Sequence, residues 1–278
     1  MRTSPYRQLA WIALAAALHV ASPARGAELF LAGDLGISFF HGRGVGTNDI
    51  VNISNAGHSE DSTPVYGGAL GAMFPLSAAL PWKMRMPGFA VPYWPGRELR
   101  FRESDEFGFP DWRVRVECEH LRGRDAEMTT PSFNPFDAYR VDAKSWTLMG
   151  KMRIDLPVRA PIDALYGRVP FLEPFTVYGG AGAGIVDTDF AVSTGLLIGS
   201  KESQKFSWQV LAGIGYELSE HVTLSVGWRY LNFGKAKTQL VDSTFTNRGR
   251  YAMDLEAHEF ATSLTVWFYR LPPLLGDE

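Results

Sequence analysis

The sequence predicts an all-β fold, an eight-stranded antiparallel up-and-down transmembrane β-barrel. Three observations favour it. Residues 208–234 form a hairpin with one apolar and one polar face, other segments alternate apolar residues with charges of both signs, and the N-terminus carries an export signal. No later apolar run approaches the roughly 20 residues of a spanning helix, so a membrane form of this chain must cross with strands.

The hairpin is the clearest element. Two alternating runs are joined by the short link Ser219-Glu220-His221. Successive side chains of a strand point to opposite faces, so each run has one apolar face and one face of polar and small residues. A soluble sandwich would bury the apolar face, whereas a membrane barrel would turn it to lipid, and the hairpin alone leaves both alternatives open. In the second run this face consists of Val222, Leu224, Val226, Trp228 and Tyr230.

Residues 1–27 have the features of a Sec signal peptide. Arg2 and Arg7 precede an apolar run from Trp11 to Ala21, and cleavage is expected after Ala27. The run is shorter than a spanning helix, which disfavours a membrane anchor. Loss of the segment removes three arginines, so the formal net charge changes from −3 to −6. This mildly acidic balance disfavours nucleic acid as a partner.

Eight strands are expected in a barrel domain at residues 28–268, which a tail at 269–278 follows. They cover residues 28–42, 65–74, 112–120, 145–156, 175–186, 208–218, 222–234 and 258–268. An even number of strands leaves both chain ends on the periplasmic side. Four long loops are predicted at the opposite, extracellular end, because turn-forming and polar residues dominate residues 43–63, 121–143, 187–205 and 235–256.

The strands at 112–120 and 145–156 carry the most diagnostic pattern. Charged residues of both signs alternate with apolar residues along each of them. A soluble edge strand with a solvated face would give the same pattern. The membrane barrel is preferred because four tryptophans are expected near strand ends, as in interfacial girdles. They are Trp112, Trp146, Trp208 and Trp228.

The polar parity of the strands predicts a charged lumen. An eight-stranded barrel has an interior just wide enough for side chains, so charges inside it must pair. Arg229 is expected to pair with Glu217 or with Glu259. The alternative is that several charges lie at the rims and are simply hydrated. The predicted lumen charge network consists of Asp34, Arg113, Arg115, Glu117, Glu119, Lys151, Arg153, Asp155, Glu217, Arg229 and Glu259.

Glycine is concentrated in the strand at 175–186. Gly180, Gly182 and Gly184 share the inward parity and are expected to make room for long side chains from opposite strands. A nucleotide-binding glycine loop is the rival interpretation. It is disfavoured because no amphipathic helix follows the run.

The connection at 75–111 is an insertion of a different composition. It is rich in proline and aromatic residues and contains several arginines. Periplasmic turns of outer-membrane barrels are normally short. Two interpretations stay open: a plug or collar that packs against the base of the barrel, or a basic and aromatic surface for phospholipid headgroups or peptidoglycan.

Three stretches resemble those of a known group of proteins. They are PFTVYGGAGAGI (174–185), the hairpin at 208–234, and the closing HEFATSLTVWF (258–268). All three are similar to segments of the small outer-membrane β-barrel proteins of Gram-negative bacteria, the OmpA-like transmembrane domain superfamily. The resemblance spans about residues 28–268 and implies the barrel fold. It implies no single activity, because members include structural, adhesive, permeability and enzymatic proteins.

We therefore expect an integral outer-membrane protein with a structural or surface-interaction role. One alternative is a soluble periplasmic lipocalin-like carrier. The other is a lipid A-modifying enzyme, which needs a serine, a histidine and an acid on its outer surface. His258 and Ser263 have opposite parities, so no catalytic site is predicted, nor a cofactor or metal site. The expected partners are outer-membrane lipid and lipopolysaccharide, the barrel-assembly machinery, and an extracellular ligand bound by the loops.

Overall fold

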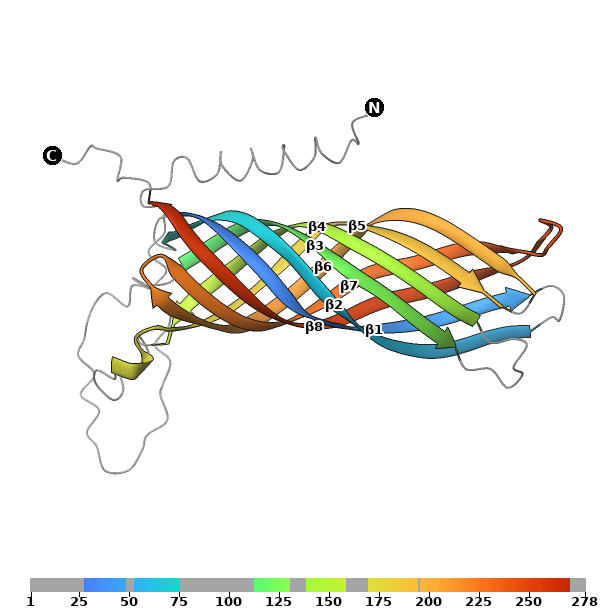
Figure 1. The fold of residues 1–278 in the computed structure, drawn as a ribbon, viewed down its shortest axis with the longest axis horizontal. Coiled ribbons are helices and arrows are strands. Elements are labelled where there is room, and N and C mark those ends of the chain that lie inside the picture. Colours follow the sequence, from blue (N-terminus) through green and yellow to red (C-terminus); the bar gives the residue numbers. More distant parts are fainter. Residues whose placement is uncertain are drawn as a thin grey trace, which may run out of the picture.

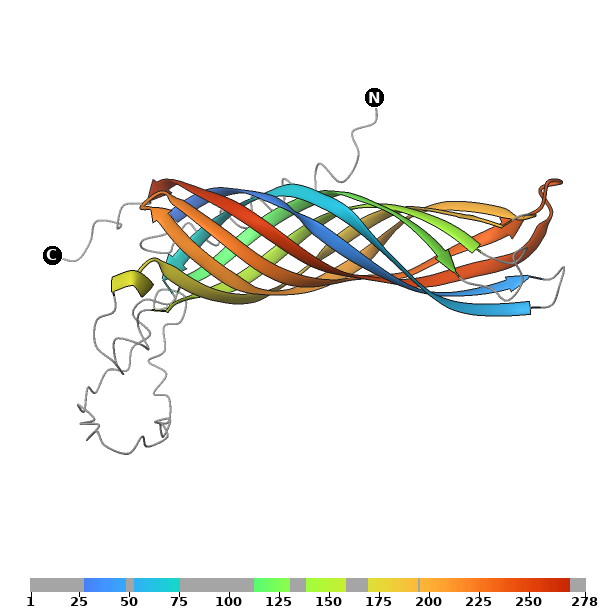
Figure 2. The same cartoon turned by 60° about the horizontal axis from the view of Figure 1, so that its bottom comes forward.

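A computed structural model describes residues 28–48, 53–75, 113–130, 139–158, 170–194 and 196–270. Within them it confirms the predicted fold. Eight antiparallel strands form a closed barrel in which each strand pairs with its neighbours in sequence and β8 closes onto β1 (Figures 1 and 2). The strands are β1 (Glu28–Asn48), β2 (Ile53–Pro75), β3 (Arg113–Thr130), β4 (Tyr139–Pro157), β5 (Phe175–Ser193), β6 (Ile198–Ser219), β7 (Val222–Val241) and β8 (Asn247–Arg270), with a short 3-10 helix, η1 (Pro170–Leu172), before β5.

Three predicted segments lie outside the described residues. They are the signal peptide at 1–27, the insertion between β2 and β3, and the chain beyond Arg270. Both interpretations of the insertion therefore stay as predictions. The barrel itself ends at Arg270 instead of residue 268.

The strands are much longer than predicted. They contain between 18 and 24 residues, and most of the four predicted long loops proves to be strand. At about 3.3 Å per residue and a tilt of about 40°, such strands span roughly 45 to 60 Å, well beyond the apolar band of about 25 Å of an outer-membrane barrel. The prediction of long loops was wrong because the distal parts of the strands carry polar residues on their outward face. Their composition is therefore the same as that of a loop.

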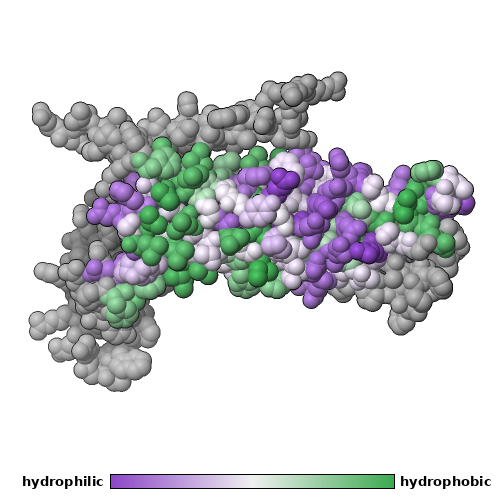
Figure 3. Space-filling model, viewed as in Figure 1, coloured by the Kyte–Doolittle hydropathy of each residue, from purple (hydrophilic) through white to green (hydrophobic). Residues whose placement is uncertain are grey.

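The barrel has two halves of opposite construction. We call the end where β1 begins and β8 ends (left in Figure 1) the proximal end, and the opposite end the distal end. The halves meet near the level where Ser38 of β1 pairs with Glu259 of β8. Figure 3 shows apolar side chains over the proximal half and a largely polar surface beyond it. The proximal exterior includes Leu35, which is 67% exposed, as well as Met152, Ile214 and Phe260.

Aromatic and histidine rings surround the barrel at mid-height. The Trp208 and Tyr230 ring centroids are 5.4 Å apart, and those of Tyr230 and His258 are 5.2 Å apart. On the other side, the rings of His120 and Trp146 are separated by 5.7 Å. Aromatic side chains favour membrane interfaces, so this ring marks the distal limit of the apolar band. The expectation that these tryptophans lie near strand ends was wrong, because the strands continue past the band; Trp112 lies outside the described residues.

Candidate functional site

The proximal lumen contains a chain of buried ion pairs, which begins with two arginines from adjacent strands. Arg115 of β3 and Arg153 of β4 lie directly opposite each other in the register, where like charges repel. Asp155 binds both: its two oxygens accept from Arg153 Nε at 2.6 Å and Nη2 at 3.1 Å, and Arg115 Nη2 lies 3.5 Å from Oδ2. Arg115 Nη1 is also 3.8 Å from Glu117 Oε1. One carboxylate thus joins two cations that would otherwise destabilise the barrel.

The chain continues distally through Lys151. Its Nζ lies 3.0 Å from Glu117 Oε2 and 2.7 Å from Glu119 Oε1. Glu119 also accepts from Arg229 Nη1 at 2.8 Å and from Gln209 Nε2 at 3.1 Å, so it joins strands β3, β4, β6 and β7 across the lumen. Because charge-assisted contacts of this length are the strong ones, Glu119 is the centre of the network.

The distal end of the chain is formed by Glu259. Arg229 lies opposite it in the register and brings Nε to 2.6 Å from Oε2. Arg124 Nε donates to Oε1 at 2.5 Å, and Ser38 Oγ donates to the same oxygen at 3.0 Å. Arg124 Nη1 donates to Thr147 Oγ1 at 3.2 Å. All of these groups are buried.

The network alternates strictly in sign and is balanced. From the proximal side, the order is Arg153, Asp155, Arg115, Glu117, Lys151, Glu119, Arg229, Glu259 and Arg124. Asp34 lies beside Lys151 and Arg229 and hydrogen-bonds Ser263, which makes five acids to five bases. An unpaired buried charge costs several kcal/mol, so this balance is what allows the charges to remain inside.

Arginines of the network also stack on rings. The Arg115 guanidinium carbon lies 4.6 Å from the centroid of Phe30 and 4.7 Å from that of Trp267. The corresponding distance from Arg153 to Tyr178 is 3.9 Å. Such cation–π contacts compensate part of the hydration that a buried guanidinium loses.

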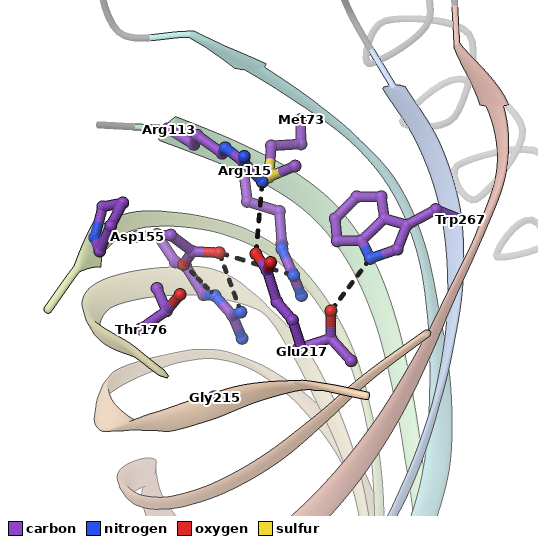
Figure 4. Close-up of a pocket in the computed structure, with 11 residues that line it drawn as sticks. Met73, Arg113, Arg115, Asp155, Thr176, Gly215, Glu217 and Trp267 are labelled. Atoms are coloured by element: carbon purple, nitrogen blue, oxygen red, sulfur yellow. Dashed lines mark hydrogen bonds and ion pairs between the residues drawn. The ribbon is translucent and has the colours of Figure 1, made fainter. Parts of the chain in front are cut away.

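Side chains of β3, β6, β7 and β8 meet around a pocket at the proximal mouth (Figure 4). Arg113 Nη1 of β3 lies 3.6 Å from Glu217 Oε1 of β6, and both side chains are 45% exposed. Trp267 Nε1 donates to Thr223 Oγ1 at 3.1 Å. These residues and Asp155 line a pocket of about 30 Å³, which has room for one or two waters.

The structure brings nine of the eleven predicted network residues into the lumen and leaves two at the rim. The rim pair is Arg113 and Glu217, as the hydration alternative anticipated for some charges. Arg229 pairs with Glu259, one of its two expected partners, and not with Glu217. Its second partner, Glu119, comes from across the barrel, a contact that strand parity alone does not specify.

Sequence reasoning missed Arg124. The predicted loop at 121–143 is wrong at its start, because β3 continues through a bulge between Leu121 and Arg124, with Gly123 at φ +99°. The extra residue shifts the side-chain alternation by one position, so Arg124 points inward although its parity differs from that of Glu119. A glycine inside a charged alternating run was the available signal, since glycine in a strand often marks a bulge.

One of the inward glycines admits a network lysine. A Cβ atom at Gly182 would lie 2.8 Å from Lys151 Cγ and 3.1 Å from Gln209 Nε2. The glycine therefore leaves space for side chains of the two adjacent strands, β4 and β6, and not of opposite strands as predicted. The prediction that this glycine makes room for long side chains is confirmed, but the strands that supply those side chains were predicted wrongly because the pairing register was unknown.

The distal lumen has the opposite content. It is filled by a cluster of buried apolar side chains from all the strands except β2 and β6, together with Leu197 of the β5–β6 turn. The cluster begins where the network ends. Tyr251 lies at its centre, with its ring centroid 4.8 Å from that of Tyr139 and 6.1 Å from that of Phe190. The exterior of this half carries exposed ion pairs such as Arg140 with Glu127, at 2.7 Å. The distal half is therefore built like a water-soluble barrel.

The β7–β8 turn at the distal end is tightly hydrogen-bonded. Asp242 Oδ1 accepts from the backbone nitrogens of Thr244 and Thr246 at 2.8 and 3.0 Å, and Oδ2 accepts from Arg248 Nε at 2.8 Å. The hydrogen bonds from Thr244, Arg248 and Thr246 hold the pKa of the Asp242 carboxyl well below its usual range. They also hold Phe245 at φ +58°, a left-handed conformation that non-glycine residues rarely adopt.

Features of other kinds of site are absent from the part of the chain that the structure describes. It contains no group of three or more histidine, cysteine or acidic side chains arranged to hold a metal ion. No helix within these residues is long and apolar enough to cross a membrane. On the barrel exterior His258 stacks on Trp228 at 5.7 Å, while Ser263 faces inward beside Asp34.

Comparisons with solved structures return small outer-membrane proteins. Neisserial surface protein A has 14% identity, covers 87% of this chain and 99% of its own, with a TM-score of 0.37. OprG from Pseudomonas aeruginosa has 12% identity, with 88% and 98% coverage and a TM-score of 0.49. Ail, the attachment invasion locus protein of Yersinia pestis, has 14% identity, with 85% and 99% coverage and a TM-score of 0.31. No curated protein sequence matches the chain.

The family match is more specific. Residues 109–268, more than half of the chain, match the outer membrane protein beta-barrel domain family. The match covers strands β3 to β7 and most of β8.

A soluble lipocalin-like carrier is thereby excluded, since the apolar proximal exterior is a lipid-facing surface. With both chain ends on the periplasmic side, the proximal half is the membrane-spanning half and the distal half is extracellular. This chain belongs to the outer membrane protein beta-barrel domain family and is an integral β-barrel of the outer membrane of a Gram-negative bacterium.

Proposed function

We propose that this protein is a non-conducting surface-interaction barrel, whose extracellular half is a rigid stem that presents turns to a partner. The observation that carries the proposal is the inverted construction of the two halves. A channel would need a polar passage through both halves, whereas the extracellular lumen is packed with apolar side chains. A stem with an apolar core and a polar exterior remains rigid in water.

The charge network supports closure of the other half. Nine of its ten charged groups alternate in sign along the lumen, and with Asp34 the five acids and five bases neutralise one another. Glu119 and Glu259 are fully buried, so neither is free to line a water-filled passage. We infer that the network is a plug that joins opposite walls of the barrel.

The distal turns support an interaction role. Phe245 is 82% exposed on the hydrogen-bonded β7–β8 turn, and Leu196 is 68% exposed on the β5–β6 turn. The two turns are adjacent, because Ile198 pairs with Val241 at their bases. Large apolar side chains on rigid turns form good contact surfaces, since little conformational entropy is lost on binding.

Planar-bilayer recording tests the closed lumen. The purified barrel should give no stepwise channel conductance, with an outer-membrane porin as the positive control. Recurrent open-channel steps from the purified protein would refute the plug.

Adhesion of cells to hexadecane droplets tests the distal turns. Cells that express the protein should partition into hexadecane more than cells that express the Leu196→Ser, Phe245→Ser double variant at equal surface level. Equal partition would show that the turns present no accessible apolar surface and would contradict this part of the proposal.

The proposal assigns no catalytic role to the protein. The alternative of a lipid A-modifying enzyme is tested by mass spectrometry of lipid A from an expressing strain. Unchanged lipid A is expected, and loss or gain of an acyl chain would replace the surface-interaction proposal with the enzymatic one.

A further inference from the structure

Three large apolar side chains are exposed together at the distal ends of β5 to β8. Phe245 and Leu196 are joined by Ile198, which is 56% exposed at the base of the β5–β6 turn. The two turns adjoin each other because Ile198 pairs with Val241. Figure 3 shows apolar side chains at this end of the molecule (right), which a polar wall separates from the apolar membrane band. We call Leu196, Ile198 and Phe245 the tip cluster.

Both turns that carry the tip cluster are fixed by internal contacts. Leu197 N donates to Thr194 Oγ1 at 3.0 Å, and Thr194 N donates to the Leu197 carbonyl oxygen at 2.8 Å. The Leu197 side chain is fully buried in the distal apolar cluster and so anchors this turn. On the other turn, Asp242 N donates to the Thr246 carbonyl oxygen at 3.1 Å. The tip cluster is therefore preformed, and little conformational entropy is lost when it binds.

The tip cluster lies far outside the membrane that holds the barrel. Ile198 is ten residues away from Trp208 of the aromatic ring on the same strand. At about 3.3 Å per residue and a tilt of about 40°, this separation corresponds to about 25 Å. The bilayer around the barrel therefore does not reach the cluster, and any surface that covers it comes from the extracellular side.

The end of the β7–β8 hairpin adds positive charge beside the cluster. Lys237, Arg248 and Arg250 are exposed on its outward face, whereas Asp242 is the one acid in the sequence from 237 to 250. Three bases thus stand against one acid, and the carboxylate of that acid already accepts hydrogen bonds from Thr244, Thr246 and Arg248. Apolar side chains flanked by cations are complementary to a bilayer that contains anionic lipid.

The size of the tip cluster favours a bilayer over a protein as its partner. A stable protein interface buries about 800 Å² on each partner, with roughly 20–30 residues a side. Three side chains on two turns supply only a small part of such an area. Insertion into a bilayer needs no matching surface, because each apolar side chain is stabilised separately when it leaves water for the acyl boundary.

We propose that the tip cluster inserts into the headgroup region of an opposing bilayer, with Lys237 and Arg250 beside its anionic headgroups. This inference rests on the proposed surface interaction and names its partner, a second membrane that contains anionic lipid. A single barrel binds weakly, because only three apolar side chains enter the lipid. Many barrels in one outer membrane bind the opposing surface together, and multivalency strengthens the attachment.

Vesicle capture by the barrel in immobilised phosphatidylcholine nanodiscs tests the proposal, since the nanodisc covers the apolar band of the barrel. The probes are vesicles of phosphatidylcholine alone and vesicles that also contain phosphatidylserine. The wild type should capture the anionic vesicles, and the Leu196→Ser, Phe245→Ser variant should not. The Lys237→Gln, Arg250→Gln variant loses two charges, each worth on the order of 1 kcal/mol at an anionic surface. Its apparent affinity for the anionic vesicles should therefore fall about thirtyfold or more.

Two control variants should capture vesicles as the wild type does. Val45→Ser replaces an exposed apolar residue of β1 outside the tip cluster, and Arg140→Gln removes an exposed cation of β4. All variants should keep the heat-dependent gel shift of a folded barrel. Equal capture by the double Ser variant and the wild type would overturn the proposal. Equal capture of both kinds of vesicle by the wild type would overturn the anionic partner.

The hexadecane assay separates failure of this inference from failure of the proposed function. If Leu196 and Phe245 promote partition into hexadecane but the wild type captures no vesicles, the surface interaction stands and the membrane as its partner is overturned. If neither effect is found, the interaction role of the turns is overturned as well.

Discussion

The two halves of this barrel use the same strands and the same alternation, yet invert what they place inside. In the membrane-spanning half the exterior is apolar and the lumen holds ten charged groups. In the extracellular half the lumen is apolar and the exterior carries ion pairs. Strand β8 passes through both, from Phe260 turned to lipid to Met253 buried in the lumen.

The solvent accounts for the difference. Apolar side chains gain nothing from turning inward where the surroundings are lipid, so the lumen of that half is left for polar groups, which must then satisfy one another. Outside the membrane water surrounds the wall, and apolar burial again stabilises the interior. The change from one construction to the other takes place at Arg124, whose guanidinium pairs with Glu259 on one side and lies 5.4 Å from the Phe233 ring on the other.

The largest effect is expected from a break in the charge network. Arg229→Ala removes the contacts to Glu119 and Glu259 and leaves excess buried negative charge, which should cost about 3–5 kcal/mol of unfolding free energy. Urea unfolding in lipid vesicles measures it, together with the temperature of the gel shift. The matched control is Arg140→Ala, an exposed ion pair of the extracellular half worth at most about 1 kcal/mol. If the two variants are equally stable, the lumen charges do not form a coupled network.

A cavity in the extracellular lumen should act on that half alone. Phe190→Ala removes a buried ring next to Tyr251 and should cost about 3 kcal/mol or more. The loss should appear as faster hydrogen exchange and proteolysis of the distal strand ends, while the membrane-spanning half keeps its gel shift. Phe245→Ala, at an exposed phenylalanine, is the control. Uniformly increased exchange along the strands would mean that the two halves unfold as one unit.

Glycine substitutions compare the tightness of the two lumens. A Cβ at Gly182 would approach Lys151, and one at Gly44 would lie 2.1 Å from the Tyr251 hydroxyl oxygen. Each Gly→Ala variant should therefore cost about 1–3 kcal/mol, measured by urea unfolding. Gly33→Ala is the control, because nothing lies within 4 Å of its added Cβ. A Gly182→Ala variant as stable as Gly33→Ala would show that the network side chains shift at no cost.

The smallest effect concerns the pH dependence of the β7–β8 turn. The folded pKa of Asp242 lies below its unfolded value near 4, so its stabilisation of the turn is fully present above that value and is lost as pH falls through the folded pKa. The backbone amide shifts of Thr244 and Thr246 should thus stay unchanged to below pH 4 in NMR spectra. If these shifts titrate near pH 4, the pKa of Asp242 is not lowered in the folded turn. The Asp242→Asn variant, which has no carboxyl group at this position, should show no titration.

The membrane-spanning half was largely predictable from sequence, because lipid imposes one rule on it. Outward positions such as Leu35 and Phe260 must be apolar, so the alternation shows the strand, and the charges on the other parity lie in the lumen or, like Arg113 and Glu217, at its mouth. The extracellular half escaped prediction for the converse reason. The stretch of β8 from Asn247 to Glu256 has so many polar residues that its composition resembles that of a loop. Tyr251, Met253 and Leu255 nevertheless alternate with these polar residues and are buried in the lumen.

The sequence by itself determined the all-β class, the eight strands, their inward parity in the membrane and most members of the charge network, because these depend on local alternation and composition. Only the tertiary structure decided how far the strands continue, that Arg124 joins the network past the Gly123 bulge, and that Glu119 binds Arg229 across the lumen. Those features depend on pairing register and barrel closure. Both are set by contacts between residues far apart in the chain, which alternation along one strand does not encode.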